Sequence, residues 1–364
     1  MSTRAVERPR LLAWLLGGIG CFAVYVALFL AGGAFGEIAL AGLEVLPFLL
    51  LALLAYLSLG HDWLRPVAAV WLAIMILSIV GLSFTYGLNA LPEGDDSGAL
   101  ALVAGCVIGV AAGALCYLPS VRRLLARWLP LEPRSFIHAT ALALVVSVTM
   151  IEFVPLIVVG EPPLLVTIRA QGGGSEDDSL LVSIYGLLWI VPASVIAVGF
   201  PVARSLRAAL VRLGFVRPTR RQVAFGVLAA AGMVLLFIFV DGAIARLWEA
   251  FGWTQTDGDA VGELFEADTS LLGAVVIGVT AGLGEELAVR GVLQPRLGIL
   301  LPNLFFTALH ALQYNFDGLL SVFIAGLIFG LIRRRTNTTT SAIVHGGYDF
   351  ILVSLAALAV PGFS

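Results

Sequence analysis

Two adjacent glutamates stand inside an apolar stretch of the sequence, and an arginine follows the second of them by four residues. The stretch reads GLGEELAVRGVL over residues 282–293, and its charged residues are Glu285, Glu286 and Arg290. A charged side chain at the centre of a bilayer costs about 2.5–3.5 kcal/mol even on the mildest insertion scales. Three such residues together therefore indicate a polar chamber inside the membrane, and carboxylates there are suited to activating water for hydrolysis.

The spacing divides these three residues between two roles. In an α-helix Glu286 and Arg290 are four residues apart and share a face, so they can form an ion pair. Glu285 lies about 100° away around the helix and cannot join that pair in the same way. We therefore expect the Glu286–Arg290 pair to support the helix and Glu285 to face a water molecule. The alternative is a solvated pair of glutamates at a helix end.

Two histidines follow in later apolar segments. His310 comes four residues after Phe306, and His345 comes four residues before Asp349, so the members of each pair share a helix face. Hydrolysis of an amide requires a general base, a donor for the developing oxyanion and a small wet cavity. Glu, His and Asp side chains gathered in a membrane can meet these requirements. For either histidine alone, a satisfied position in a packed core is the alternative.

Three further ionisable residues are weaker candidates. Glu152 and Asp241 lie inside apolar segments, and His138 begins one. Each is an interfacial anchor, a partner in a helix–helix hydrogen bond or part of the lining of the same cavity, and the sequence does not choose among these.

The composition identifies the elements that must hold these residues. Hydrophobic residues make up 60% of the 364-residue chain and charged residues 12%, whereas a soluble protein has about 25% charged residues. We therefore predict an all-α polytopic transmembrane bundle with about 10–11 membrane helices, since each span needs about 20 mostly apolar residues. The segment 301–315 is short and is expected to be tilted, broken or partly buried. The candidate segments are 11–32, 38–59, 66–89, 98–118, 136–159, 179–203, 222–245, 271–294, 301–315, 317–333 and 341–361.

The loops between these segments alternate in charge. Positively charged loops stay in the cytoplasm, so we place the N-terminus in the cytoplasm, the C-terminus outside and the protein in the cell membrane. On this topology Glu285, Glu286 and Arg290 lie in the cytoplasmic half of their helix. The basic loops are 119–135, 204–221 and 333–335, and the acidic loops are 93–96, 176–178 and 257–268.

The chemistry-bearing residues also resemble the motifs of a known family. The CPBP family contains the type II CAAX prenyl endopeptidases and bacteriocin-processing or immunity proteins, and its members are often described as intramembrane metalloproteases. The resemblance is close over residues 270–355. It implies a protease-like domain over 136–364, preceded by a transmembrane extension of about four helices over 1–135. The three motifs are Glu285-Glu286-x-x-x-Arg290, Phe306-x-x-x-His310 and His345-x-x-x-Asp349.

The resemblance implies a role for each of these residues. Glu285 and His310 would activate the attacking water. Glu286, Arg290 and Phe306 would support the site, and His345 and Asp349 would line the oxyanion side. The prenyl-protein proteases of the family carry Asn where this chain has Asp349, and an ionised carboxylate cannot donate to an oxyanion. Asp349 is therefore expected to be protonated, to orient His345 or to bind a cation.

The metal requirement stays open at this point. Glu285, His310 and His345 form an adequate ligand set for zinc, which agrees with the usual label of the family. The related prenyl endopeptidases work as glutamate-dependent enzymes, and this favours a mechanism with no obligatory metal. The sequence therefore predicts either no required cofactor or a zinc ion.

We predict an intramembrane endopeptidase that hydrolyses a peptide bond of a membrane-associated protein or peptide, with CAAX-type substrates included. Its partners are that substrate and the lipid bilayer, with no nucleic acid. The alternative is a non-catalytic membrane scaffold or immunity-type protein that keeps the polar cluster for helix packing. A transporter with a proton relay is a third class, against which the Phe-x-x-x-His and His-x-x-x-Asp spacings argue.

Overall fold

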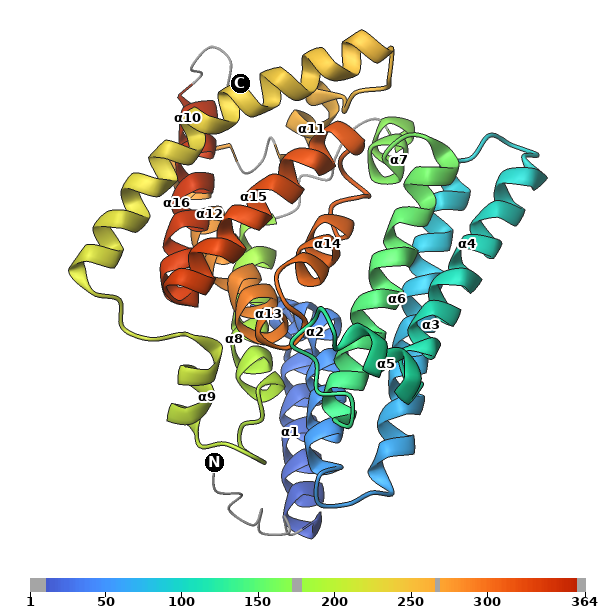
Figure 1. Ribbon diagram of the computed structural model, residues 1–364, viewed down its shortest axis with the longest axis vertical. Coiled ribbons are helices and arrows are strands. Elements are labelled where there is room, and N and C mark those ends of the chain that lie inside the picture. The colour runs from blue at the N-terminus through green and yellow to red at the C-terminus, as the bar shows by residue number, and fades with distance from the viewer. Residues whose placement is uncertain (1–10, 172–178, 266–268, 359–364) are drawn as a thin grey trace.

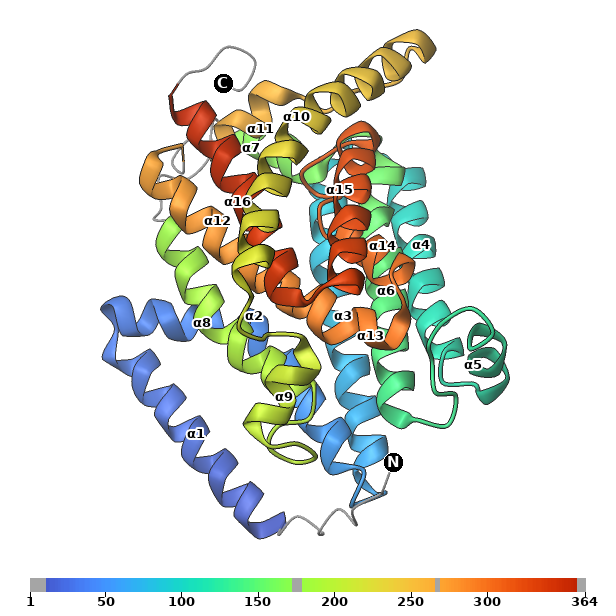
Figure 2. The same cartoon turned by 60° about the vertical axis from the view of Figure 1, so that its left-hand side comes forward.

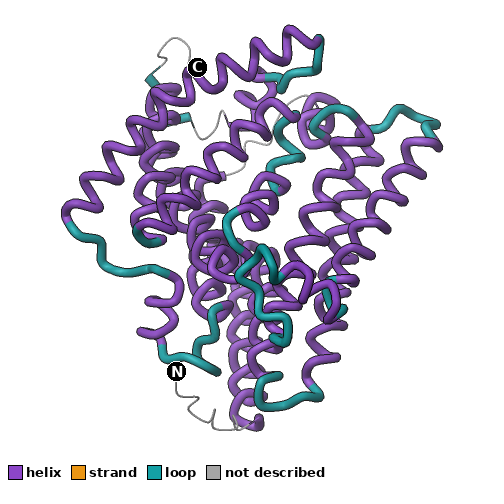
Figure 3. The backbone as a smooth tube through the Cα atoms, viewed as in Figure 1, coloured by secondary structure: helices purple, strands orange, loops and turns teal. Residues whose placement is uncertain are grey.

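The computed structural model describes residues 11–171, 179–265 and 269–358 of the chain. Figure 3 shows helices and connecting loops throughout this part of the chain, so the predicted all-α fold is confirmed. The helices are α1 (Leu11–Ala31), α2 (Gly33–Leu57), α3 (Leu64–Ala90), α4 (Asp96–Leu115), α5 (Pro119–Leu125), α6 (Phe136–Val159), α7 (Pro163–Gln171), α8 (Ser179–Ala197), α9 (Leu206–Leu213), α10 (Arg220–Phe251), α11 (Gly258–Phe265), α12 (Leu271–Glu285), η2 (Glu286–Leu293), α13 (Gln294–Leu297), α14 (Leu300–Ala308), α15 (Phe316–Arg335) and α16 (Thr338–Ala357).

Nine helices in the described residues are long and apolar enough to cross a membrane. They are α2, α3, α4, α6, α8, α10, the rod formed by α12, η2 and α13, and then α15 and α16. The predicted polytopic bundle is therefore confirmed. Two of the eleven predicted segments depart from this pattern. α1 counts only as a shorter apolar helix over Gly20–Ala31, and the segment 301–315 contains the nine-residue α14.

The chain around α14 passes through the protein although its helix is short. At one end Gly298 lies beside Pro130, in the loop that precedes α6. At the other end the backbone N–H of Leu164, just beyond α6, donates to the carbonyl of Leu312 at 3.0 Å. Because α14 packs against α6, protein surrounds these turns, and non-helical backbone is tolerated at membrane depth under that condition. The segment is therefore broken and partly buried, as predicted.

Loops of like predicted charge gather at the same end of the bundle. At one end, which we call the basic face (loops 126–135, 214–219 and 336–337), the N–H of Val216 donates to Thr339 Oγ1 at 3.0 Å. At the other end, the acidic face (loops 160–162 and 252–257), Arg169 forms an ion pair with Asp257. Of the predicted acidic loops, residues 176–178 and 266–268 lie outside the described part of the chain.

Two groups of helices are joined by a central pair. α3 and α4 pack against α6 on one side, and α10, α12, α15 and α16 pack together on the other (Figure 1). α2 packs against α8, and α8 packs in turn against α12. The view in Figure 2 shows α8 lying between α2 and α12. α2 and α8 therefore connect the early helices to the helices that carry the predicted site.

The contact between α12 and α16 brings two backbones together. Gly278 and Gly282 lie four residues apart on α12, and both face Gly346 of α16. A methyl group on Gly346 would lie 2.1 Å from the carbonyl oxygen of Gly278, so the approach requires glycine. Small residues at this spacing permit close helix packing in membranes. Since His345 precedes Gly346, this contact sets the position of the predicted site residues on α16.

We predict that Gly346→Ala destabilises the protein by about 1–3 kcal/mol, because the added methyl group forces the two helices apart. Thermal unfolding of the detergent-solubilised protein measures the effect as a lower Tm. The matched control is Gly232→Ala on α10, where a methyl group meets no atom within 4 Å and alanine favours the helix. Equal melting temperatures for Gly346→Ala and wild type would show that the fold does not depend on this contact.

Candidate active site

The two adjacent glutamates stand where one helix changes its geometry. α12 ends at Glu285, and the chain continues as the π-helix η2 over Glu286–Leu293. The prediction of one regular helix over 271–294 misses this change. π-helical turns are rare and are frequent at functional sites, and here the turn begins between the two carboxylates.

Two long side chains, one on η2 and one at the start of α13, attach this part of the rod to the backbone of α15. Arg290 Nη2 donates to the carbonyl of Gly326 at 3.0 Å. Four residues later on both helices, Gln294 Nε2 donates to the carbonyl of Gly330 at 2.8 Å. A methyl group on Gly326 would lie 1.9 Å from Asn303 Oδ1, so α15 has no room for a side chain there. The two bonds hold the wide turn against α15.

Glu286 and Arg290 form the predicted ion pair, and both are removed from solvent. Glu286 is 0% exposed and Arg290 is 1% exposed, with Nη1 of the guanidinium 3.2 Å from Oε1 of the carboxylate. The other carboxylate oxygen accepts from Ser341 Oγ at 2.6 Å. Oε1 also lies 3.1 Å from Nδ1 of His345. A buried charge needs such partners because it has lost its hydration.

Aromatic rings complete the surroundings of the guanidinium. Arg290 Cζ lies 4.5 Å from the centroid of the Phe306 ring and 5.6 Å from that of Phe329, a cation–π arrangement. Phe329 stacks on the imidazole of His345 at a centroid distance of 4.3 Å. Phe306 meets the imidazole of His310 edge-on at 4.9 Å. The supporting role predicted for Phe306 therefore has a geometric basis in these contacts.

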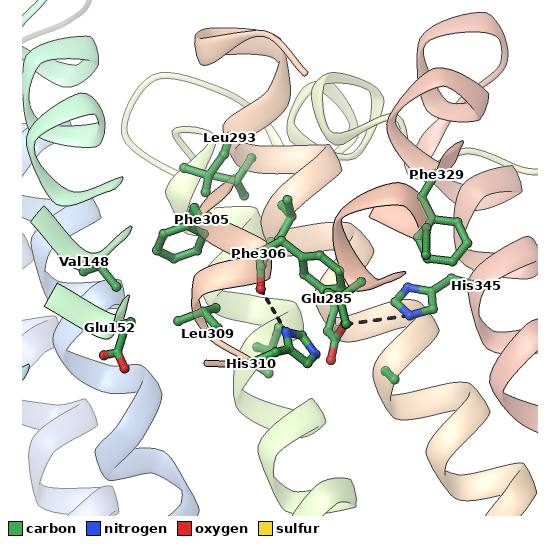
Figure 4. A pocket seen from close by; sticks show the side chains of 18 of the residues that line it. Val148, Glu152, Glu285, Leu293, Phe305, Phe306, Leu309, His310, Phe329 and His345 are labelled. Atoms are coloured by element: carbon green, nitrogen blue, oxygen red, sulfur yellow. Dashed lines mark hydrogen bonds and ion pairs between the residues drawn. The ribbon is translucent and has the colours of Figure 1, made fainter. Parts of the chain in front are cut away.

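The polar atoms outside this buried pair face a common space. His345 Nε2 lies 3.8 Å from Glu285 Oε2 and 3.4 Å from Asp349 Oδ2. The side chain of Glu285 is 38% exposed and that of Asp349 is 19% exposed. Nδ1 of His310 donates to the carbonyl of Phe306 at 2.9 Å, because a carbonyl only accepts, and Nε2 is the ring nitrogen left. Figure 4 shows Glu285 lying between His310 and His345.

These side chains form part of the wall of a cavity of about 1360 Å³. The four predicted catalytic residues, Glu285, His310, His345 and Asp349, all line it. Much of the remaining wall is apolar. α2 contributes Phe48, Ala52 and Ala55, whereas α6 and α8 contribute Ile137, Ala141, Leu144, Val148, Ile190, Ala193 and Ala197. The sequence motifs therefore converge on one polar region of a largely hydrophobic chamber.

The residues that bring this site together match a known family. Residues 267–351 match the family model described as type II CAAX prenyl endopeptidase, Rce1-like. Over these residues the chain is similar to the Rce1-like family. The match begins just before α12 and ends within α16, so the region includes every residue of the three motifs. No curated protein and no solved structure matched the chain.

The described residues of the Rce1-like region contain no cluster of metal-ligating side chains. Within the described residues, no three or more His, Cys, Asp or Glu side chains are grouped so that they could hold an ion. Nδ1 of His345 is bonded to Glu286, and Nδ1 of His310 is bonded to a backbone carbonyl. Such Nδ1 bonds also orient histidines that ligate a metal through Nε2, so the zinc prediction for Glu285, His310 and His345 stays a prediction.

The three weaker candidates occupy different positions. Glu152 and Asp241 both line the cavity, and Asp241 accepts a hydrogen bond from Ser321 Oγ. His138 lies at the start of α6, where Nδ1 accepts from the backbone N–H of Glu132 at 2.9 Å. His138 is therefore tied to a loop of the basic face and does not contribute to the Rce1-like site.

Sequence reasoning missed several side chains that hold the Rce1-like site together. Ser341 bonds to Glu286, yet its position in a run of Thr and Asn indicates only the start of a helix. Ser341 stands four residues before His345, and this spacing indicates that the two side chains share one face of a helix. Phe329, Gln294 and Asn303 have no such signal, because the sequence contains many similar residues and only packing selects these.

We predict that Arg290→Ala destabilises the protein by about 3–5 kcal/mol, because it leaves the Glu286 carboxylate buried without its counter-charge. A large decrease in Tm of the detergent-solubilised protein is the expected result. The matched control is Arg65→Ala, which breaks the exposed pair between Arg65 and Asp62 and is expected to cost about 0–1 kcal/mol. An unchanged Tm for Arg290→Ala would mean that the pair is solvated in the membrane.

Proposed function

We propose that the protein is an intramembrane endopeptidase that hydrolyses a peptide bond of a membrane-associated protein or peptide. The observation that carries this proposal is the convergence of Glu285, His310, His345 and Asp349 on one wall of the cavity. CAAX-type proteins are the substrate class that the family description suggests. A largely apolar chamber suits a substrate that reaches the site from the bilayer.

Glu285 is the proposed general base. It takes a proton from a water molecule as the water oxygen attacks the carbonyl carbon of the substrate, and His310 assists from the other side of that water. The same proton then passes to the amide nitrogen as the C–N bond breaks. The exposure of Glu285 to the cavity supports this role, whereas the adjacent Glu286 is fully buried and paired.

His345 is the proposed donor to the oxyanion. Nδ1–H donates to Glu286, which fixes the ring so that Nε2 faces the cavity. The proposed role requires the doubly protonated imidazolium, because only then does Nε2 carry a proton to donate. A donor placed before the reaction begins stabilises the charge that develops on the carbonyl oxygen. Asp349 lies on the Nε2 side of the ring at 3.4 Å, a position that suits it to orient His345. This role requires no hydrogen-bond donation from Asp349 itself.

We place the basic face in the cytoplasm and the protein in the cell membrane. The arginine-rich loops of that face support this orientation through the positive-inside rule. It puts the N-terminus in the cytoplasm, and the substrate enters the cavity from the cytoplasmic side.

Glu285→Gln is predicted to abolish cleavage, by a factor of about 100 or more, while the protein stays folded. The measurement uses purified protein with a pool of membrane peptides and whole-membrane substrates, analysed by mass spectrometry and paired with thermal unfolding. The matched control is Glu249→Gln on α10, an exposed position outside the cavity lining, which is expected to cleave like wild type. Wild-type cleavage by Glu285→Gln would contradict the assignment of the base.

A chelator added to the wild-type reaction tests the remaining question of a cofactor. We propose that no resident metal is required, so cleavage is expected to continue in the chelator. Loss of cleavage that returns with added zinc would contradict this. Absence of cleavage by wild type across a broad substrate pool would favour the alternative of a scaffold or immunity-type protein.

A further inference from the structure

The cavity contains a carboxylate that the proposed reaction does not use. Glu152 lies in the middle of α6 (Phe136–Val159), where it is the only acidic residue. Its side chain points from α6 into the cavity, and Figure 4 shows it beside Val148 on the side toward Leu309 and His310. Glu152 therefore faces the catalytic groups from the opposite wall.

Glu152 lacks hydrogen-bonding partners of the kind that Glu286 and Asp241 possess. Glu286 is bonded to Ser341 and His345, and Asp241 is bonded to Ser321. In the described part of the chain, no hydrogen bond or ion pair is formed by the carboxylate of Glu152. An unpaired carboxylate in a membrane interior is costly, so a protein that places one there gains when a cation occupies the space beside it.

The walls around Glu152 carry more carboxyl groups than guanidinium groups. Among the described lining residues, Arg296 carries the one guanidinium group. It already donates hydrogen bonds to Tyr56 Oη at 2.7 Å and to the carbonyl of Ala197 at 2.9 Å. No lysine is present anywhere in the sequence. The acidic lining residues are Glu44, Glu152, Asp241, Glu285, Asp317 and Asp349.

We propose that Glu152 is a specificity-determining residue that binds a positively charged side chain, lysine or arginine, of the substrate near the scissile bond. The inference rests on the proposed peptidase function and adds to it a preference for basic peptides. The apolar side chains of Val148 and Leu309 beside Glu152 can pack against the aliphatic stem of such a residue. In a cavity of low dielectric, a paired charge contributes more than it does in water.

The test compares peptides that differ in one residue at positions flanking the cleavage site. Each position carries lysine, norleucine or glutamate. Norleucine keeps the aliphatic stem of lysine without its charge. Wild type in lipid nanodiscs is expected to favour lysine over norleucine at one position by at least about tenfold in kcat/KM. Glu152→Gln is expected to remove that preference, so that kcat/KM for the lysine peptide falls to that for the norleucine peptide. Glu152→Lys is expected to favour the glutamate peptide.

Glu249→Gln, which removes a carboxylate outside the cavity lining, serves as the control and should keep the lysine preference. If Glu152→Gln does not fold, Glu152→Met replaces it as an uncharged side chain of similar length. An equal ratio of lysine to norleucine cleavage in wild type and in the uncharged variant would overturn the inference.

A binding measurement separates this inference from the proposed function. If wild type cleaves no peptide, fluorescent lysine and norleucine peptides are titrated against wild type and Glu152→Gln in nanodiscs. Tighter binding of the lysine peptide to wild type alone would support the cationic subsite although the peptidase proposal had failed. Equal binding of both peptides to both proteins would overturn the subsite.

Discussion

The buried pair of Glu286 and Arg290 is the interaction on which the rest of the site depends. Two opposite charges removed from water are stable only when each keeps its hydrogen-bonding partners. Those partners come from several helices: Gly326 and Phe329 from α15, Ser341 and His345 from α16, and Phe306 from α14. Any movement of one helix would leave a charge unsatisfied. The pair therefore fixes the relative positions of four chain segments with one electrostatic constraint.

This constraint gives two neighbouring and chemically identical residues opposite environments. Glu286 is turned into the protein, where its oxygens are occupied, whereas Glu285 is turned toward the cavity. The change from α12 to η2 occurs between them. The imidazole of His345 lies between the two glutamates, since Nδ1 contacts the buried Glu286 and Nε2 faces the exposed Glu285. One imidazole thus contacts both the buried ion pair and the side chains that face the cavity.

Residue types and spacings predicted much of this arrangement because the relevant interactions are local. The ion pair, the division between Glu285 and Glu286 and the short segment at 301–315 all follow from helix geometry and from the length needed to cross a bilayer. The π-helical turn could not be predicted, because it depends on the bonds from Arg290 and Gln294 to the backbone of α15. The stacking of Phe329 on His345 is equally non-local, since nothing in the sequence distinguishes this phenylalanine from the others.

The wall that α2 provides lies far in sequence from the residues that match the Rce1-like family. Phe48, Ala52 and Ala55 line the chamber, and Tyr56 of the same helix bonds to Arg296 at the end of the rod formed by α12, η2 and α13. In the proposed peptidase, the groups that break bonds and part of the surface that meets the substrate are thus encoded in separate stretches of the gene. Substitutions in α2 can alter the width and shape of the chamber while the reactive groups stay as they are. The substrate selectivity of the proposed peptidase can therefore change during evolution while hydrolysis is retained at every step.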